Sequence, residues 1–388
     1  MTVREPGRPV GVLVAAWFLV DFDLAVVNPL LVPASQSLHV GLRSVALALT
    51  AYLLLFGLMQ PVYGLISDAV GRVRVLRTAM LAWGAANLIA TLAPDVTVLI
   101  VGRALAGGCA AAVVPVTAAY VGDRFPMDRM QRTMALLLSA SAVGAATATI
   151  VAGTLAELAS WRYAIVVVAL AAPVLSWWCR RLPEDRRSGG PGISARSRLR
   201  TALAPRWLRF LLIFLLIDGA AMLGFYNFFN ASLQLHGASV LTAGLVTSVY
   251  GLAAIGGGLL VRFRLDAMAP PLSFALAALV LTAGYAVAAL QQTRVTILVA
   301  SLCAGVALSV GQSTMQTWVL RVAPAEVRGT ATSLVACTVF TGAAAGTAAV
   351  GGLAGAGEFR TLFLCAAAVS LFVAVVGTLA LRRYQLNP

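Results

Sequence analysis

Long apolar stretches, separated by short polar turns, recur along the whole chain. Each is about 20 residues or longer and nearly free of charge, which is the length needed to cross a bilayer as a helix. Backbone polar groups in lipid must be satisfied within their own segment, so each stretch is predicted to be a transmembrane helix. The sequence thus predicts an all-α polytopic membrane protein with 12 spans, at residues 10–35, 43–66, 74–93, 96–121, 132–156, 161–179, 207–235, 239–262, 271–290, 294–322, 328–352 and 359–381.

The composition supports this prediction and argues against a soluble protein. Hydrophobic residues make up 60% of the 388 positions and charged residues only 11%, against about 25% charged in a soluble domain. The mean hydropathy is +0.92. The first stretch contains Asp21 and Asp23 and is long enough to span the bilayer, so we expect no cleavable signal peptide.

Arginine supplies the cationic charge, because all 28 basic residues are arginine and the net charge is +14. If both termini are cytoplasmic, the inner loops hold all but five of these residues, as expected for a protein of the cell inner membrane. The charge also favours contact with anionic lipid headgroups rather than with nucleic acid. We expect the chain to act as a monomer. The five exceptions are Arg43, Arg162, Arg294 and Arg360 in outer loops and Arg103 inside a helix.

Two similar halves are visible in the sequence. Short matches recur at a spacing of 197 residues, as from Asp21 to Asp218 and from His39 to His236. The predicted organisation is a six-helix bundle at 1–179, a Gly- and Pro-rich cytoplasmic linker at 180–206, and a second six-helix bundle at 207–388. Parallel repeats of six helices with a site between them characterise a large class of secondary transporters.

The polar turn after the second stretch reads Gly64-x-x-x-Asp68-x-x-Gly71-Arg72. This pattern resembles the loop signature of the major facilitator superfamily, and of its twelve-helix drug:proton antiporters in particular. The resemblance implies that Asp68 caps a helix and pairs across the interface between the halves, as part of a conformational switch. The residues alone indicate a tight turn with charge for topology. A second, eroded copy runs from Gly258 to Arg264 and Asp266.

The first apolar stretch contains two acids and a second motif. Asp23-x-x-x-x-Asn28 is similar to the drug-exporter pattern of helix 1, and Asp21 and Asp23 lie about 15–20 Å into the membrane. A charged carboxylate there costs at least about 2.5–3.5 kcal/mol, so each acid should face a cavity, be paired or be protonated. Side chains two positions apart on a helix point in directions that differ by about 200°, so the two acids cannot face the same cavity. Asp23 is favoured for proton coupling, and interhelical hydrogen bonding is the alternative role.

Arg103 is the expected partner of the helix 1 acid. It lies in Leu99-x-x-x-Arg103-x-x-x-Gly107, which is similar to the helix 4 pattern of the same exporters. The resemblance assigns such an arginine to proton transfer or to holding the acid, whereas the residues alone allow a packing salt bridge. The proton-coupling candidates are Asp23, Arg103, Asp21 and Asp218.

The fifth stretch departs from the exporter pattern. The positions that align with its Gly-Pro motif are Gly144, Ala148, Thr149, Ala152 and Gly153. Loss of the central Gly-Pro weakens the case for antiport more than the case for transport. The small residues remain, and they permit close helix packing.

Uncharged polar side chains within the spans are candidates for contact with a cargo, and we expect about half of them to touch it. Aromatic and amide groups together suit an amphipathic organic molecule. The candidates are Asn28, Tyr52, Gln60, Asp218, Tyr226, Asn227, Asn230, Gln234, Tyr250, Gln312, Ser313, Gln316 and Trp318.

Other functional classes fit less well. An enzyme would need converging His, Cys or acidic residues, yet both histidines lie in predicted outer loops and the five cysteines have no paired or metal-binding spacing. There is no phosphate-binding loop, so no cofactor or metal is expected. We expect a non-enzymatic secondary transporter that exports a hydrophobic or amphipathic small molecule, coupled to protons. The alternatives are uptake, uncoupled facilitation, or a sensor built on a transporter fold.

Overall fold

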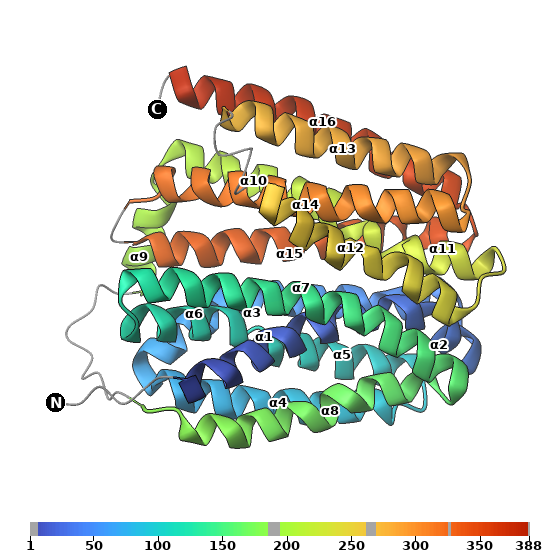
Figure 1. Cartoon of the computed structure of the whole chain (residues 1–388), viewed down its shortest axis with the longest axis horizontal. Helices are drawn as coiled ribbons and strands as arrows, with labels where there is room; N and C mark the ends of the chain where they lie inside the picture. The colour runs from blue at the N-terminus through green and yellow to red at the C-terminus, as the bar shows by residue number, and fades with distance from the viewer. Residues whose placement is uncertain (1–6, 185–194, 261–268, 325–326, 387–388) are drawn as a thin grey trace.

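The computed structural model describes residues 7–184, 195–260, 269–324 and 327–386, and the regular structure in these ranges is helical (Figure 1). The first half contains α1 (Gly7–Val26), η1 (Asn28–Leu30), α2 (Leu31–Ser37), α3 (Leu42–Val70), α4 (Arg72–Thr91), α5 (Val96–Ala110), α6 (Val113–Arg124), α7 (Met127–Leu158), α8 (Trp161–Trp178) and η2 (Cys179–Arg181). The rest contains α9 (Ala195–Leu203), α10 (Arg206–Gly219), η3 (Ala220–Gly224), η4 (Tyr226–Phe228), α11 (Phe229–Leu235), α12 (Val240–Leu260), α13 (Pro270–Leu290), α14 (Arg294–Val322), α15 (Arg328–Gly355) and α16 (Phe359–Leu386).

The predicted spans correspond to these helices. Within the described ranges, 11 helices or runs of helices are long and apolar enough to cross a membrane. The remaining predicted span is α4, which begins with Arg72, Arg74 and Arg77 and is therefore less apolar. It packs against α5 and α8 and so belongs to the same bundle. The all-α, twelve-helix architecture is confirmed.

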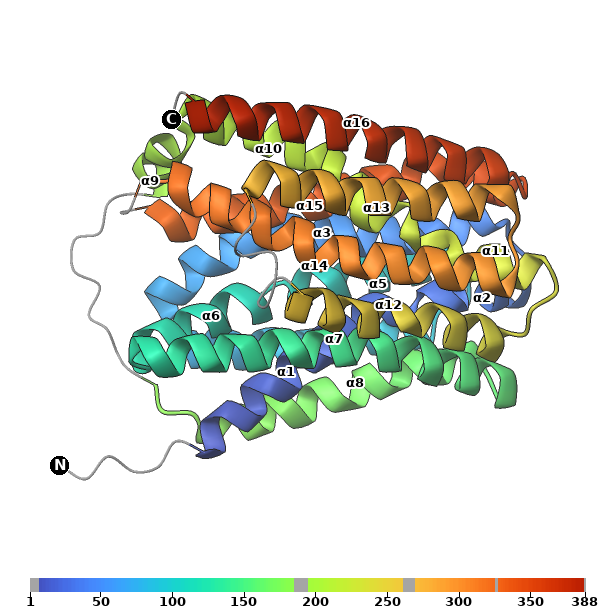
Figure 2. The same ribbon diagram turned by 45° about the horizontal axis from the view of Figure 1, so that its top comes forward.

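The two halves meet through two pairs of long helices. α3 packs against α15, and α7 packs against α12. Figure 2 shows α12 lying along α7, and α9 at the same end of the molecule as the start of α1 and the end of α16. We call this end, which also carries Arg72 and Arg124, the arginine-rich end. The opposite end, which carries His39 and His236, is called the histidine end.

Small residues bring the α7 and α12 backbones into contact. A Cβ built on Gly153 would lie 2.9 Å from Leu241 Cα, and one on Gly244 would overlap the Thr149 carbonyl oxygen. Within the first half, Gly144 lies against the Phe18 carbonyl oxygen. The small residues that replace the exporter motif in α7 therefore do pack closely, as the sequence predicted.

The packing places the internal repeat at a spacing of 198 residues, one more than the sequence matches indicate. Gly144 meets the Phe18 carbonyl, and its counterpart Gly342 meets the Leu216 carbonyl. Likewise, η1 begins at Asn28 and η4 begins at Tyr226, so both pairs are 198 residues apart.

This shift changes which residues are equivalent. The counterpart of Asp21 becomes Gly219 rather than Asp218, and the counterpart of His39 becomes Gly237. The latter pair shares a left-handed backbone, with φ of 53° at His39 and 89° at Gly237. The prediction that the two histidines are equivalent was wrong. A three-residue match is too short to fix the register of a repeat, whereas contacts between backbone atoms fix it directly.

Part of one predicted motif lies outside the described residues. Of the eroded second copy of the loop signature, Gly258 lies in α12, while Arg264 and Asp266 belong to residues 261–268. The domain boundaries at 179, 180–206 and 207 remain a prediction.

Candidate functional site

Asp23 and Arg103 form an ion pair in the interior of the first half. Asp23 Oδ1 lies 2.5 Å from Arg103 Nη1, and both side chains are 0% exposed. Arg103 Nη2 also donates to the backbone carbonyl of Asp23 at 2.9 Å. Because α1 ends at Val26, the Asp23 carbonyl belongs to its last turn, where carbonyls lack partners within the helix. The arginine thus satisfies both the carboxylate and the helix end.

Two side chains of α4 hydrogen-bond to this pair. Trp83 Nε1 donates to Asp23 Oδ2 at 2.7 Å. Asn87 donates to the same oxygen at 3.3 Å and accepts from Arg103 Nη1 at 2.7 Å. The Arg103 guanidinium carbon lies 4.4 Å from the centre of the Tyr52 ring, within cation–π range. A buried charge pair is tolerable only with this degree of hydrogen bonding.

Little space adjoins the pair. A cavity of about 10 Å³ beside Arg103 is scarcely large enough for one water molecule. Its other walls are apolar, formed by Val27, Leu30, Ala34, Val45, Ala48, Leu99, Trp161 and Ile165. In this conformation Asp23 and Arg103 are in a dry contact.

Asp21 lies on a different face of α1. Its side chain is partly exposed. The helix that carries it packs against α7, which in turn packs against α12 of the second half. Asp21 is therefore less enclosed than Asp23, which is bonded inside the first half.

Four of the predicted cargo-binding side chains gather beside the seam between the halves, on the side of the second half. The rings of Tyr226 and Tyr250 stack with centroids 4.2 Å apart. Tyr226 donates to the Thr247 carbonyl at 3.3 Å, and Asn230 donates to the Thr247 hydroxyl at 2.8 Å. Asn227 follows Tyr226 directly and bonds to Thr347 of α15. These residues come from η4, α11 and α12.

Asn28 and Gln234 connect this group to the first half. Gln234 Nε2 donates to the Pro29 carbonyl at 2.9 Å. Asn28 is the residue before Pro29 and is 4% exposed. η1 contacts both α11 and α12, so the junction between the halves at the histidine end includes both amides.

The other predicted cargo and coupling residues are dispersed. Tyr52 lies inside the first half under Arg103. Trp318 packs with Trp207, with ring centroids 6.1 Å apart, and Gln312 and Gln316 are exposed on α14. Asp218 is buried, and its Oδ1 has no hydrogen-bond partner among the described residues.

The loop between α3 and α4 forms an ion-pair network at the arginine-rich end. Arg72 lies 2.9 Å from Asp68 and 2.7 Å from Asp123 of α6. Gly71 has a φ of 108°, a conformation that side chains other than glycine rarely adopt. Gly64 faces Ser333 of α15, and a Cβ built on it would lie 4.0 Å from the serine hydroxyl. The loop is thus held within the first half and lies close to the second.

Glu184 is a functional candidate that the sequence reasoning missed. Its two carboxylate oxygens accept from the backbone amides of Val73 and Arg74 at 3.0 and 2.9 Å. These amides belong to the first turn of α4, which lacks partners within the helix and favours a negative charge. The signal in the sequence was an acidic residue at the start of an arginine-rich linker.

Trp83 and Asn87 were also missed. Asn87 is an amide within a predicted span, and polar groups at such depth usually have an assigned partner. The sequence does not reveal which face of α4 meets α1, so the partner was not predictable.

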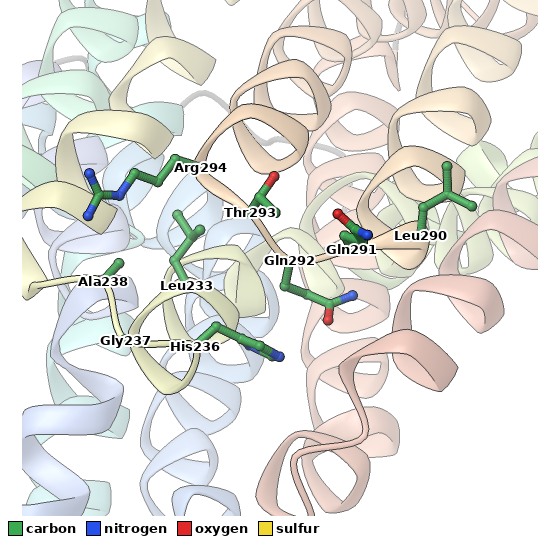
Figure 3. Close-up of a pocket in the computed structure, with 9 residues that line it drawn as sticks. All are labelled: Leu233, His236, Gly237, Ala238, Leu290, Gln291, Gln292, Thr293 and Arg294. Atoms are coloured by element: carbon green, nitrogen blue, oxygen red, sulfur yellow. The ribbon is translucent and has the colours of Figure 1, made fainter.

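An open cavity of about 560 Å³ lies at the histidine end of the second half (Figure 3). Its walls are Leu233, His236, Gly237, Ala238, Leu290, Gln291, Gln292, Thr293 and Arg294. In Figure 3 the side chains of Arg294 and His236 point away from each other. The predicted site residues do not line this cavity.

The fold and the buried ion pair define a polytopic membrane protein with a polar centre, and the comparisons identify its family. The sequence profile of the Major Facilitator Superfamily matches residues 13–347 and 233–387. The chain belongs to this superfamily of membrane transporters.

Characterised relatives are similar over part of their length. The puromycin resistance protein pur8 of Streptomyces alboniger is 36% identical over 180 residues, covering 46% of this chain and 36% of that protein. The lincomycin resistance protein of Streptomyces lincolnensis is 29% identical over 152 residues, covering 38% and 31%. The aligned parts thus span about a third of these two relatives.

Solved structures agree in fold. The peptide-transporter-family protein PepTSo has a TM-score of 0.80 at 11% identity, covering 99% of this chain and 100% of that one. A bacterial homologue of the lysosomal transporter Spinster, solved inward-facing and unoccupied, has a TM-score of 0.76 at 15% identity, covering 98% of both chains. At these identities the likeness concerns the fold alone.

Proposed function

We propose that the chain exports a hydrophobic or amphipathic small molecule by alternating access, and that it transports rather than catalyses. The observation that carries the proposal is the polar junction between the halves, where Gln234 of α11 donates to the Pro29 carbonyl at 2.9 Å and Tyr250 of α12 stacks on Tyr226. Relatives named for puromycin and lincomycin resistance favour export of organic compounds. A seam of this kind between six-helix halves is where transporters of this architecture bind substrate.

The energy source in this proposal is the proton gradient. Asp23, Arg103, Asp21 and Asp218 remain the candidates for coupling. Protonation of Asp23 would leave Arg103 buried without its counter-ion, and an uncompensated buried charge costs several kcal/mol. A protonation event at this pair therefore has enough energy to drive a rearrangement of α1 against α5.

A second candidate, uncoupled facilitation, is favoured by two observations. The Asp23–Arg103 pair is dry, and α7 lacks the Gly-Pro of the exporters. If the pair stays closed in every state, it stabilises the first half without carrying protons.

The proposed setting is the cell inner membrane, with the arginine-rich end cytoplasmic, because arginine-rich loops stay inside. The chain would act as a monomer of two six-helix bundles joined by the linker at 180–206. Labelling of single cysteines introduced at Ser188 and at Gln36 with an impermeant reagent tests this orientation.

The deciding experiment uses proteoliposomes of the full chain with an imposed pH gradient. A panel of fluorescent amphipathic compounds is loaded, and their efflux is followed with and without the gradient. Gradient-driven efflux of some compounds supports the coupled exporter. Efflux that ignores the gradient supports the facilitator, and no movement of any compound contradicts both.

A further inference from the structure

The open cavity at the histidine end is lined by residues of the second half alone. Two turns form most of its walls: the turn between α11 and α12 at residues 236–238, and the turn between α13 and α14 at residues 291–293. Its volume of about 560 Å³ lies within the range of cavities that bind small molecules. The kind of ligand that it can hold depends on the free polar groups in its walls.

One side of this cavity is cationic. Arg294 lines it and has neither an ion pair nor a hydrogen bond within the described part of the chain. None of the nine residues that line the cavity is acidic. Arg294 is also the first residue of α14, where the helix dipole adds positive potential. This side therefore favours a negatively charged group.

The other side presents hydrogen-bond acceptors. His236 Nδ1 lies 2.7 Å from the Ser232 carbonyl oxygen, so Nδ1 carries the proton and Nε2 of the neutral ring is an acceptor. Gln292 Nε2 donates to the Ala288 carbonyl at 2.8 Å, which leaves Gln292 Oε1 to accept from a ligand. In Figure 3 the Arg294 guanidinium lies on the opposite side of the cavity from the side chains of His236 and Gln292.

The rim of the cavity carries exposed aliphatic side chains. Leu290 lines the cavity and is 75% exposed, and Val295, which follows Arg294, is 71% exposed. They lie at the end of α13 and the start of α14, where these membrane helices reach the surface of the bilayer. Large apolar side chains that are exposed beside polar ones are typical of a membrane contact. The cavity therefore suits a ligand with a polar head and an apolar tail.

We propose that the cavity binds an anionic lipid with a phosphoglycerol headgroup. The phosphodiester pairs with Arg294, the glycerol hydroxyls donate to His236 Nε2 and Gln292 Oε1, and the acyl chains lie against Leu290 and Val295. The two acceptors separate this headgroup from phosphocholine, which has the same phosphodiester but no hydroxyl or N–H donor. In the proposed orientation the lipid belongs to the outer leaflet, and its site is separate from the transport path.

The test measures lipid binding to the purified full chain in detergent by native mass spectrometry. The probes are dioctanoyl phosphatidylglycerol, dioctanoyl phosphatidylcholine, and glycerophosphoglycerol, which has the same headgroup without acyl chains. The wild-type chain should bind the phosphatidylglycerol at least about threefold more tightly than the phosphatidylcholine, because only the former supplies hydrogen-bond donors.

Two variants and a matched control locate the site. Arg294→Gln should weaken binding of the phosphatidylglycerol about three- to fivefold, near the upper end for an exposed ion pair. Arg360→Gln should leave it unchanged, because Arg360 is also an exposed arginine in the first turn of a helix at this end but does not line the cavity. Gln292→Leu removes one acceptor and should weaken binding of the phosphatidylglycerol about two- to tenfold without weakening that of the phosphatidylcholine. Unfolding midpoints of the three variants separate lost binding from misfolding.

Two results would overturn the inference: equal affinity of the wild-type chain for both lipids, or equal binding of the phosphatidylglycerol by Arg294→Gln and Arg360→Gln. Glycerophosphoglycerol distinguishes a lipid from a soluble ligand. If it binds as tightly as the lipid, the cavity serves a soluble phosphodiester and the assignment to lipid is wrong. A failure of export in proteoliposomes leaves these affinities unchanged, so the two proposals fail separately.

Discussion

Asp21 and Asp23 lie two residues apart on α1 yet belong to different environments. Asp23 is fully enclosed and bonded to Arg103, whereas Asp21 is partly exposed. The helical turn of about 100° per residue separates the two side chains by about 200°. One acid is thus part of the interior of the first half, and the other lies on a different and less enclosed face of the same helix.

The first prediction concerns the buried pair. Asp23→Asn and Arg103→Ala should each reduce pH-gradient-driven efflux at least tenfold while membrane insertion persists, because each removes one half of the coupled pair. Each should also destabilise the chain by about 3–5 kcal/mol, since the remaining polar group loses its partner. Proteoliposome efflux and thermal unfolding in detergent measure the two effects.

A double variant separates coupling from stability. Asp23→Asn with Arg103→Gln removes both charges, so it should recover most of the lost stability without recovering efflux. Full efflux in the double variant would assign the pair a structural role only.

The second prediction concerns the indole that holds Asp23. Trp83→Phe removes the donor to Asp23 Oδ2 and should lower stability by about 1.5–3 kcal/mol, the range for hydrogen bonds to charged groups. Trp161→Phe is the matched control, because the Trp161 indole N–H has no hydrogen-bond partner in the described structure. Unfolding midpoints in detergent compare the two. Equal shifts of the unfolding midpoint in both variants would mean that the Trp83 hydrogen bond does not contribute to stability.

The third prediction concerns the close approach of α1 and α7. Gly144→Ala places a Cβ against the Phe18 carbonyl oxygen, so the helices must separate. We expect a loss of about 1–3 kcal/mol, typical of overpacking. Gly256→Ala, where a Cβ meets nothing within 4 Å, should be neutral or slightly stabilising. A stability assay in which Gly144→Ala matches Gly256→Ala would contradict the packing argument.

The fourth prediction concerns the contact between the halves at the histidine end. Glu157 of α7 accepts from the backbone amide of Leu241 in α12 at 3.0 Å. Glu157→Leu should weaken this contact between α7 and α12. It should therefore increase the fraction of molecules in which the two halves are apart at the histidine end. Spin labels on Gln36 and His236, measured by pulsed electron resonance, should then report a longer distance.

Glu358→Leu is the matched control for that measurement. Glu358 is an acid at the same end that directly precedes α16 and accepts from the Thr361 hydroxyl of that helix. It should leave the distance distribution unchanged. An identical distribution in Glu157→Leu and wild type would mean that other contacts hold this end closed.

Much of the architecture was predictable because it follows from the composition and length of the apolar segments. Spans of about 20 apolar residues require helices in lipid, and the arginine pattern limits how they are arranged. The pairing of Asp23 with Arg103 was also predictable in outline, because a positive and a negative charge at similar depth in one apolar bundle stabilise each other. The contribution of Trp83 and Asn87 was not, since it depends on which face of α4 meets α1.

The internal repeat shows where sequence similarity misleads. The matches at Asp21 and His39 indicate a spacing of 197, but glycine contacts at Gly144 and Gly342 place it at 198. A shift of one residue rotates a helical side chain by about 100°. Asp218 consequently does not repeat the role of Asp21, which the sequence had suggested.

By itself, the sequence determined that this protein is a bundle of membrane helices with a few ionisable groups at depth, because hydropathy and chain length act locally along each segment. Only the tertiary structure decided which of those groups are enclosed and which remain partly exposed. That outcome depends on helix rotation and on contacts between residues 60 to 80 positions apart, and neither is encoded in any single segment.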